Sequence, residues 1–464
     1  MQVVKTDKGY VSGTQIGQPG KEVSIFRGIP YAAPPVRNLR WKPPQPAAAW
    51  EGIRECTRFT PMSPQIIMPK MAPDLPLSED CLYLNVVTPA REPDEKLPVM
   101  VWMHGGGYSS GCGCDQIWNN YRLPQYGVVV VTLTHRLGPI GLLAHPWLSA
   151  ESPQGVSGNY LFLDLIASLQ WIQRNIAAFG GDPGNVTIFG ESGGGAKVSI
   201  MMASPLAKGL FHKGICESGT SLVILTGKTA ADSEADGQAL FKKLGVDSLE
   251  GARSIPAQKL IEASQPAQGG RTPSERMGPG SDATADGWVV PDIPRRVFAS
   301  GSYNAVPLVV STNLGELMPG PLELSALTKA YVEMLESGIK KGMIGYACVF
   351  DQVPAGWKKE GCVSVHSIEL PYVFGDWDDS TRWWDSVGVL ALGAKAGSVK
   401  LGLDSTDRAV SEAMMELWTS FARTGKPKAK GIPAWPEYSR AADRYLYVSG
   451  KSEVRSGFSR LPGA

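Results

Sequence analysis

The stretch from Asn185 to Gly195 constrains this chain most, because an apolar, β-prone run stops there at a serine enclosed by glycines. Residues Gly190 to Gly194 fit the pattern Gly-x-Ser-x-Gly, in which small neighbours allow a strained turn between a strand and a helix. The stretch therefore predicts a strand, a sharp turn that exposes the Ser192 hydroxyl, and a helix whose first N–H groups suit an anion. The pattern is only moderately specific in a chain with 53 glycines. The surrounding sequence therefore has to decide whether Ser192 is a nucleophile or an ordinary exposed serine in a glycine-rich turn.

Strand-like and helix-like segments alternate on both sides of this serine. Short apolar runs that predict buried strands, and one stretch of helical periodicity, precede it, and further strands follow it beyond helical and loop-rich segments. The predicted strands are 82–87, 99–103, 128–133, 214–219 and 306–311, the predicted helix is 161–178, and the helical and loop-rich stretch is 228–290. This succession favours an α/β fold with a mostly parallel central sheet and helices on both faces.

Composition excludes several classes of function. The 464 residues are 43% hydrophobic and 19% charged, which allows a sizeable core, and a net charge of +1 predicts no nucleic-acid surface. No apolar run reaches the roughly 18 residues of a membrane span, and no signal-peptide core is present. We expect one catalytic domain over 1–464, a small and largely neutral substrate, and a monomer or weak homo-oligomer. We also expect a soluble, cytoplasmic protein, or a secreted or periplasmic one if a signal peptide has been removed.

The cysteines and histidines limit which metal sites, disulfides and catalytic bases this chain can have. Seven scattered cysteines predict mostly reduced thiols, and Cys112-Gly113-Cys114 without a second Cys/His pair is a weak metal signal, so no metal or cofactor is expected. A serine nucleophile needs a base, and in enzymes with this turn the acid and then the histidine follow the serine. His135 and His145 precede it, His104 adjoins a glycine run, and His212 adjoins a strand. His366 remains as the predicted base.

The acid of such a triad belongs between Ser192 and His366, near the carboxyl end of a strand. Glu316 follows the predicted strand 306–311 and meets both conditions, and it would fix and stabilise the imidazole. Asp286 and Asp292 stay open as alternatives by chain order alone.

The glycine run after His104 follows a predicted strand and is similar to the loops that supply oxyanion donors. Gly106 and Gly107 are the predicted donors in it, together with Gly193 after the serine.

These motifs, in this order, resemble the type-B carboxylesterases, the α/β-hydrolase group that includes bacterial para-nitrobenzyl esterases and cholinesterases. The resemblance implies an α/β-hydrolase fold, an acyl-enzyme on Ser192, and a triad completed by Glu316 and His366, with Glu191 and Ser218 beside it. The segments that carry it are 26–32, 78–85, 104–108, 179–183, 186–194, 369–375, 421–425 and 433–436.

The chain departs from this family at several positions. Gly193 stands where alanine is common, and Gly315 precedes the acid Glu316 where the family has glycine after it. The resemblance also implies an early disulfide, but Ser63 occupies the place of the partner of Cys81, so we expect Cys81 to be a buried free thiol. A disulfide with the nearby Cys56 is the alternative.

The resemblance leaves three functions open: a serine esterase, a non-catalytic cholinesterase-like binding protein, and an amidase that uses the same triad. The intact set of serine, glutamate, histidine and glycines favours the esterase. Insertions at roughly 220–300 and 317–365 are predicted to form the rim of the site.

The interval between the predicted acid and base is short, which predicts a lowered wall and an open pocket. Its expected lining is Tyr108, Trp118, Phe350 and Trp357. Such a pocket favours bulky xenobiotic or toxin esters, as in bacterial members of the family that detoxify fumonisins. Surrounding loops that refill the gap are the alternative.

Overall fold

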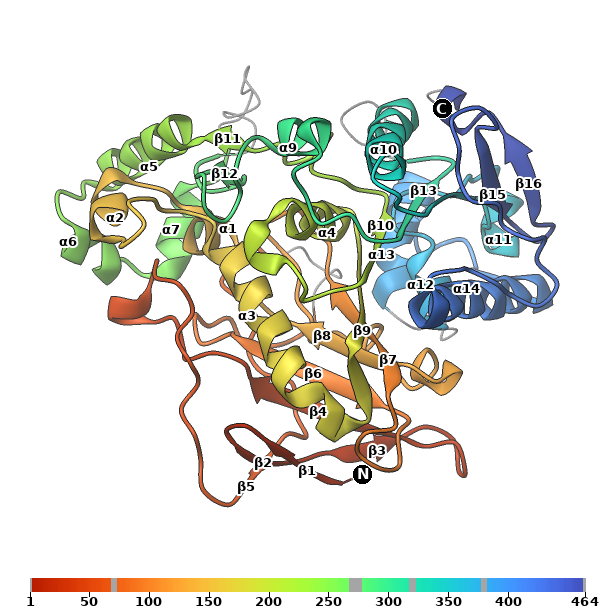
Figure 1. The fold of residues 1–464 in the computed structure, drawn as a ribbon, viewed down its shortest axis with the longest axis horizontal. Helices are drawn as coiled ribbons and strands as arrows, with labels where there is room; N and C mark the ends of the chain where they lie inside the picture. Colours follow the sequence, from red (N-terminus) through yellow and green to blue (C-terminus); the bar gives the residue numbers. More distant parts are fainter. Residues whose placement is uncertain (1, 68–72, 267–277, 317–322, 377–381, 462–464) are drawn as a thin grey trace.

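The computed structural model describes residues 2–67, 73–266, 278–316, 323–376 and 382–461. An eleven-stranded sheet runs through the molecule, with helices on both of its faces (Figure 1). From edge to edge its strands are β16 (Glu453–Ser456), β15 (Arg444–Val448), β14 (Gly345–Phe350), β13 (Leu308–Asn313), β10 (Lys213–Glu217), β9 (Gly181–Glu191), β7 (Leu97–Met103), β8 (Val129–Leu133), β6 (Tyr83–Thr88), β4 (Val23–Pro30) and β3 (Thr14–Ile16). Pairing is parallel from β15 to β8 and antiparallel at both edges, which confirms the predicted mostly parallel sheet.

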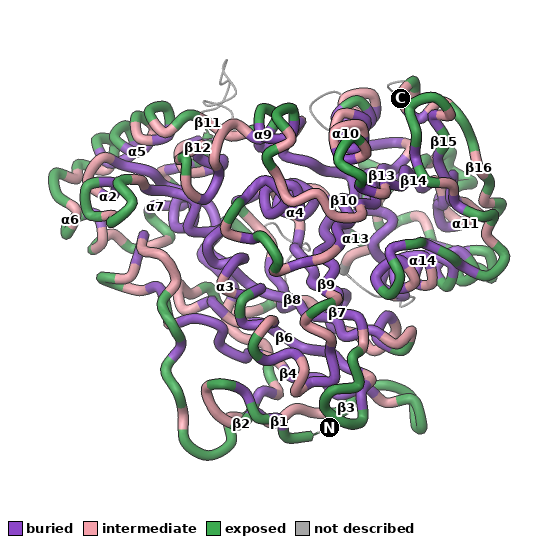
Figure 2. Tube along the Cα trace, in the orientation of Figure 1, coloured by how far each residue is buried: buried purple, intermediate pink, exposed green. Residues whose placement is uncertain are grey.

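Strand β7 shows why the sheet is covered twice. Its residues Val99, Val101 and Met103 belong to one hydrophobic core, and Met100 and Trp102 between them belong to a second core. Successive side chains of a strand point to opposite faces, so a continuous apolar run has to be buried on both sides. Figure 2 shows the resulting buried centre of the molecule.

Different helices supply the two cores. On one face the apolar sides of α3 (Tyr160–Asn175), α4 (Gly193–Ala203) and α10 (Leu324–Ile339) pack into the core that contains Val99. On the other face α12 (Leu370–Phe374), α13 (Arg382–Leu392) and α14 (Ser405–Thr424) pack into the core that contains Trp102. Helix α4 follows β9 directly, so the Ser192 turn lies where the central strand meets its covering helix.

The other elements lie around this sheet. The predicted helix 161–178 is α3 followed by a 3₁₀ turn, Ile176–Phe179. The remaining helices and strands are β1 (Val3–Thr6), β2 (Gly9–Ser12), β5 (Ile53–Glu55), β11 (Lys228–Thr229), β12 (Thr284–Ala285), α1 (Gly138–Leu142), α2 (Pro146–Glu151), α5 (Ala230–Leu244), α6 (Leu249–Ser254), α7 (Ala257–Ala263), α9 (Pro294–Ser300) and α11 (Ala355–Lys358); further 3₁₀ turns span Arg37–Leu39, Pro124–Tyr126, Pro205–Ala207, Gly393–Lys395 and Phe458–Arg460.

The segment 317–365 was predicted to be an insertion at the rim of the site, but much of its described part belongs to the core fold. Strand β14 within it is a parallel strand of the main sheet, and helix α10 covers that strand and β13. Phe350 and Trp357, expected in the pocket, are 0% and 3% exposed and belong to the core beneath α14. The loop expected at 264–282 lies partly outside the described residues, since 267–277 are not among them.

Candidate active site

The turn at Ser192 has the strained geometry that the sequence predicts. Ser192 has a φ of +57° and a ψ of −122°, which L-residues rarely adopt, and its N–H donates to the carbonyl of Glu217 on β10 over 2.8 Å. Close packing explains the flanking glycines, because a Cβ at Gly194 would lie 2.0 Å from the carbonyl oxygen of Met103. The turn is thus held between two neighbouring strands.

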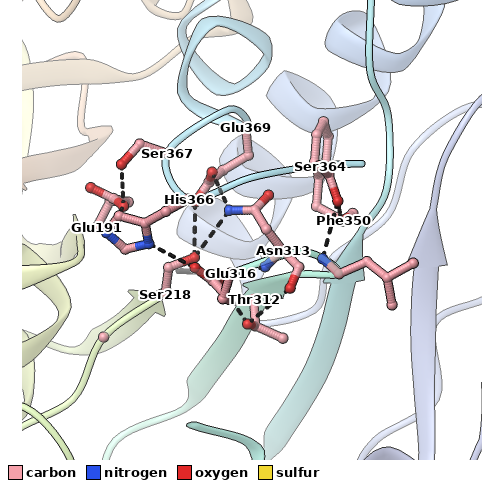
Figure 3. Close-up of polar contacts among 12 residues, drawn as sticks. Glu191, Ser218, Thr312, Asn313, Glu316, Phe350, Ser364, His366, Ser367 and Glu369 are labelled. Atoms are coloured by element: carbon pink, nitrogen blue, oxygen red, sulfur yellow. Dashed lines mark hydrogen bonds and ion pairs between the residues drawn. The ribbon is translucent and has the colours of Figure 1, made fainter. Parts of the chain in front are cut away.

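Glu316 and His366 lie together in the structure (Figure 3). Nδ1 of the His366 ring is 2.7 Å from Oε2 of Glu316. The other oxygen of this carboxylate accepts hydrogen bonds from the Thr312 hydroxyl at 2.8 Å and from the Asn313 N–H at 2.7 Å, both at the end of β13. The carboxylate is therefore fixed at both oxygens, which fixes the direction of the ring.

Two loops that are far apart in sequence hold this pair. Gly315 pairs with Val365 in a parallel bridge, and its N–H donates to the Ser364 carbonyl over 2.9 Å. A Cβ at Gly315 would lie 2.3 Å from a methyl of Val363, which accounts for the glycine before the acid. The backbone contact thus places Glu316 directly against His366.

Further carboxylates surround the histidine (Figure 3). Nε2 of His366 lies 3.1 Å from Oε1 of Glu191, which also accepts a hydrogen bond from Ser367 at 2.6 Å. Asn313 donates to Glu369 at 2.6 Å and to the Ser218 hydroxyl at 3.2 Å. Glu191 and Ser218 thus lie next to the predicted triad, as the resemblance implies.

Burial and charge oppose one another at these groups. Burial alone would lower the pKa of His366, but the negative charges of Glu191 and Glu316 outweigh it and raise this pKa to about 10. Burial also opposes ionisation of Glu316, yet attraction to His366 and its hydrogen bonds bring its pKa below the usual value. For Glu369, burial and then the charges of Glu191 and Glu217 raise the pKa well above its usual value. Glu316 is therefore the ionised partner of the histidine.

Glu217 is a further buried acid next to this cluster. Burial raises its pKa to about 8, and the Trp418 indole N–H donates to it over 3.1 Å. Burial therefore favours the protonated form of this carboxyl.

The predicted oxyanion donors come from two elements that touch. Gly106 and Gly107 have φ values of +82° and +63°, which favour glycine. Gly193 is the first residue of α4, and a Cβ there would lie 2.2 Å from the Gly107 carbonyl oxygen. Glycine rather than alanine at 193 therefore lets the loop rest directly on the helix start.

A cavity of about 340 Å³ opens over Ser192 and His366. Trp118 lines it, as predicted, and helix α13 forms the wall that was expected from 317–365. Its other described lining residues are Gln65, Ile66, Pro73, His104, Gly105, Gly106, Ser110, Gly111, Cys112, Asp115, Glu191, Ser367, Leu370, Trp383, Ser386, Val387 and Leu390. The gap that the short interval predicted is thus filled by a helix that follows His366.

Tyr108 lines a second cavity of about 390 Å³, together with Gly107 of the glycine loop. It is 1% exposed and packs edge-on against Phe162. Residues of the predicted insertion 220–300, among them Leu225 and Ile261, share this cavity with Gly107. The described residues of that insertion therefore border the glycine loop, and none of them lines the cavity over Ser192.

The alternative acids lie elsewhere. Asp286 accepts hydrogen bonds from the backbone N–H groups of residues 288–290 and from Asn159, so it holds its own loop. Asp292 lies on the surface 3.5 Å from Arg296. Neither carboxylate contacts His366.

Sequence reasoning missed Asn313, Ser367 and Glu369. Glu369 opens the family segment 369–375 and lies three residues after the predicted base His366. This position in the sequence could have indicated that Glu369 lies near the site. Asn313 and Ser367 carry no such signal, because their contacts with Glu369 and Glu191 exist only in the folded chain.

The thiols are all free. Cys56 and Cys81 are both buried without a disulfide, as are the others except the half-buried Cys362. Burial raises the pKa of Cys81 far above its usual value, whereas the neighbouring Ser63 hydroxyl lowers it. Ser63 thus lies beside Cys81, where the family resemblance implies a second cysteine, as expected.

In the described ranges, no helix is long and apolar enough to span a membrane, and no group of three or more His, Cys, Asp and Glu side chains is arranged to hold a metal ion.

Comparison with known proteins identifies the family of this chain. The model of the carboxylesterase family matches residues 1–326 and 327–460. Fumonisin B1 esterase of Sphingopyxis macrogoltabida is 32% identical over 500 residues, which cover 97% of this chain and 87% of that protein. Para-nitrobenzyl esterase of Bacillus subtilis (strain 168) is 32% identical over 504 residues, with 98% and 96% covered.

A solved structure of PNB esterase matches the fold with a TM-score of 0.78 at 29% identity, covering 98% of this chain and 97% of that one. The sheet and its covering helices are therefore an α/β-hydrolase fold. With its family match and its esterase relatives, the chain is a carboxylic ester hydrolase that belongs to the carboxylesterase family.

Proposed function

We propose that this chain is a serine carboxylesterase that forms an acyl-enzyme on Ser192. The observation that carries the proposal is the 2.7 Å contact between His366 Nδ1 and Glu316, with the ring facing the same cavity as the strained serine. Such an arrangement gives a weak nucleophile a base, and gives the base a partner that fixes its tautomer.

In the first half-reaction, Ser192 Oγ attacks the ester carbonyl carbon while Nε2 of His366 takes the serine proton. The ring has to exchange its 3.1 Å contact with Glu191 for one with Ser192, and catalytic hydrogen bonds of this kind often form only in the substrate complex. Collapse of the tetrahedral intermediate expels the alcohol, which receives that proton from His366. Water, activated by the same nitrogen, then releases the acid and restores the serine.

The N–H groups of Gly106, Gly107 and Gly193 are the proposed donors to the oxyanion. Fixed donors aimed at a developing charge in a buried site stabilise the transition state more than the ground state. The contact between Gly107 and Gly193 joins the two donor elements into one unit.

We further propose that the favoured substrates are bulky esters with neutral, apolar groups. Of the described residues that line the cavity, none is lysine or arginine, while Trp118, Leu370, Trp383 and Val387 supply apolar surface. Ile66 and Leu390 also line it and are 39% and 44% exposed, so apolar surface continues outward at the rim. A group larger than 340 Å³ can extend over this rim.

Two measurements test these proposals. Mass spectrometry after treatment with diethyl p-nitrophenyl phosphate should find the diethylphosphoryl group on the peptide that contains Ser192. Modification elsewhere would contradict the proposed nucleophile. The kcat/KM values for acetyl, butyryl, branched and aromatic esters, and for fumonisin B1, test the substrate class. A steep fall from short to bulky neutral esters would reject it.

A further inference from the structure

Lys197 on helix α4 is completely buried, one turn beyond Gly193. Its ammonium nitrogen donates to the carbonyl oxygen of His104 over 2.8 Å and lies 6.0 Å from the centre of the Tyr108 ring. No carboxylate among the described residues pairs with it, and burial lowers its pKa to about 7. A buried ammonium without a counter-charge costs free energy, so an apolar side chain would serve packing better at this position.

The hydrogen bond from the Lys197 ammonium reaches the start of the glycine loop. The carbonyl of His104 belongs to the peptide that leads into Gly105, directly before the proposed oxyanion donors. Helix α4 therefore touches this loop at two points, through Gly193 at Gly107 and through Lys197 at His104. The same helix follows the nucleophile, so one rigid element sets the position of both serine and loop.

Two histidine rings, those of His104 and His135, lie close enough to Lys197 for its charge to affect them. The rings of His104 and His135 stack at 4.5 Å and 6°. Burial, and then the nearby lysine, lower the pKa of His104 well below its usual value, and the same two causes act on His135. Both rings are therefore neutral, and a charge on Lys197 acts in a medium of low dielectric constant, where its attraction for a developing anion is strong.

We propose that Lys197 is a positioning residue for ester hydrolysis: through its hydrogen bond to the His104 carbonyl it fixes the loop of Gly105 to Gly107, which carries two of the proposed oxyanion donors. The inference rests on the proposed function, because it assumes that Gly106, Gly107 and Gly193 hold the oxyanion. Lys197 itself does not touch the substrate, since it is 0% exposed.

The test compares Lys197→Met, which keeps the length without the charge, with Lys197→Gln, which keeps a hydrogen-bond donor. Lys213→Met is the matched control, because Lys213 is also largely buried but bonds Asn185 away from the cavity. For Lys197→Met we expect kcat to fall about 10- to 100-fold with KM nearly unchanged, less than the loss of a direct oxyanion donor. The affinity for a trifluoromethyl ketone, whose adduct with Ser192 carries an oxyanion, should fall by a similar factor.

Lys197→Gln should retain more activity than Lys197→Met, and Lys213→Met should match the wild type. Unchanged kcat and ketone affinity in folded Lys197→Met would overturn the inference, and so would a change in KM alone. Loss of folding in both Lys197 variants would also overturn it, because the lysine would then serve the fold. Failure of the proposed function itself gives a different result, namely continued turnover by Ser192→Ala in the same assay.

Discussion

His366 faces two carboxylates, with Nδ1 2.7 Å from Glu316 and Nε2 3.1 Å from Glu191. The second contact involves the nitrogen that has to accept the proton of Ser192. Both carboxylates stabilise the imidazolium and raise the pKa of His366. Glu191 therefore influences the pH range in which the base is available.

This relationship predicts the pH dependence of Glu191→Gln. Removal of the negative charge makes the imidazolium less stable, so the pKa of His366 falls and the neutral base persists to lower pH. The acid limb of the kcat/KM profile should move to lower pH than in the wild type. Asp292→Asn, a change at the surface, should leave the profile unchanged. A limb that stays in place or moves upward would show that Glu191 does not set this pKa.

The three candidate acids can be separated by isosteric substitution. Glu316→Gln should lower kcat about 10⁴-fold, because the amide favours the wrong tautomer of His366. Asp286→Asn should instead lower the melting temperature, since Asp286 holds three backbone N–H groups. Steady-state kinetics and thermal unfolding of both variants, beside Asp292→Asn, provide the check. Greater loss of kcat in either aspartate variant would assign the acid elsewhere.

The contact between Gly193 and Gly107 predicts an effect of Gly193→Ala. The added methyl would lie 2.2 Å from the Gly107 carbonyl oxygen, so the glycine loop has to move away from the helix start. Displaced donors stabilise the oxyanion less, and kcat should fall about 10²- to 10³-fold with little change in stability. Gly251→Ala, in the exposed part of helix α6, where the nearest atom to an added methyl is the Ser248 hydroxyl oxygen at 3.0 Å, controls for the replacement of a helical glycine. Wild-type kcat in Gly193→Ala would show that the loop tolerates the methyl.

Ser63 and Cys81 predict a stabilising crosslink. Both side chains are completely buried, and the Ser63 hydroxyl is close enough to affect the Cys81 thiol. Ser63→Cys should therefore form a disulfide with Cys81 on oxidation, stabilising the chain by about 3 kcal/mol for a loop of this length. Thermal unfolding with and without reductant, and peptide mapping, provide the measurement. In the wild type, reductant should change nothing, and a Cys56–Cys81 crosslink would contradict the free thiols.

Local patterns carried most of the fold prediction. The strand, turn and helix at Ser192 were predictable because an apolar run, small neighbours and a helix start are adjacent in sequence. The triad order was predictable because few histidines follow the serine. Contacts between distant segments were not, so the placement of Glu369 against Asn313 emerged only from the structure.

The shape of the pocket was the least predictable feature. The short interval between Glu316 and His366 indicates a deletion relative to the family, but it does not show which segment occupies the space instead. Helix α13, which follows His366, supplies Trp383 and Val387 to the wall. Phe350 and Trp357 are aromatic and close in sequence, yet β14 and the core beneath α14 bury them. An aromatic residue in a short apolar run can lie in the core of a sheet that is covered on both faces, or it can line a pocket. The sequence pattern is the same in both cases, so it does not distinguish them.

The central claim is that Ser192 is the nucleophile, and the most direct measurement is the turnover of para-nitrophenyl acetate by Ser192→Ala. The variant should fold like the wild type, because Ser192 Oγ forms no hydrogen bond within the described residues. Its kcat should be lower by several orders of magnitude, about 10⁶-fold by analogy with other serine triads. Circular dichroism and thermal unfolding verify the fold in the same preparation. Turnover near the wild-type rate by folded Ser192→Ala would contradict the account.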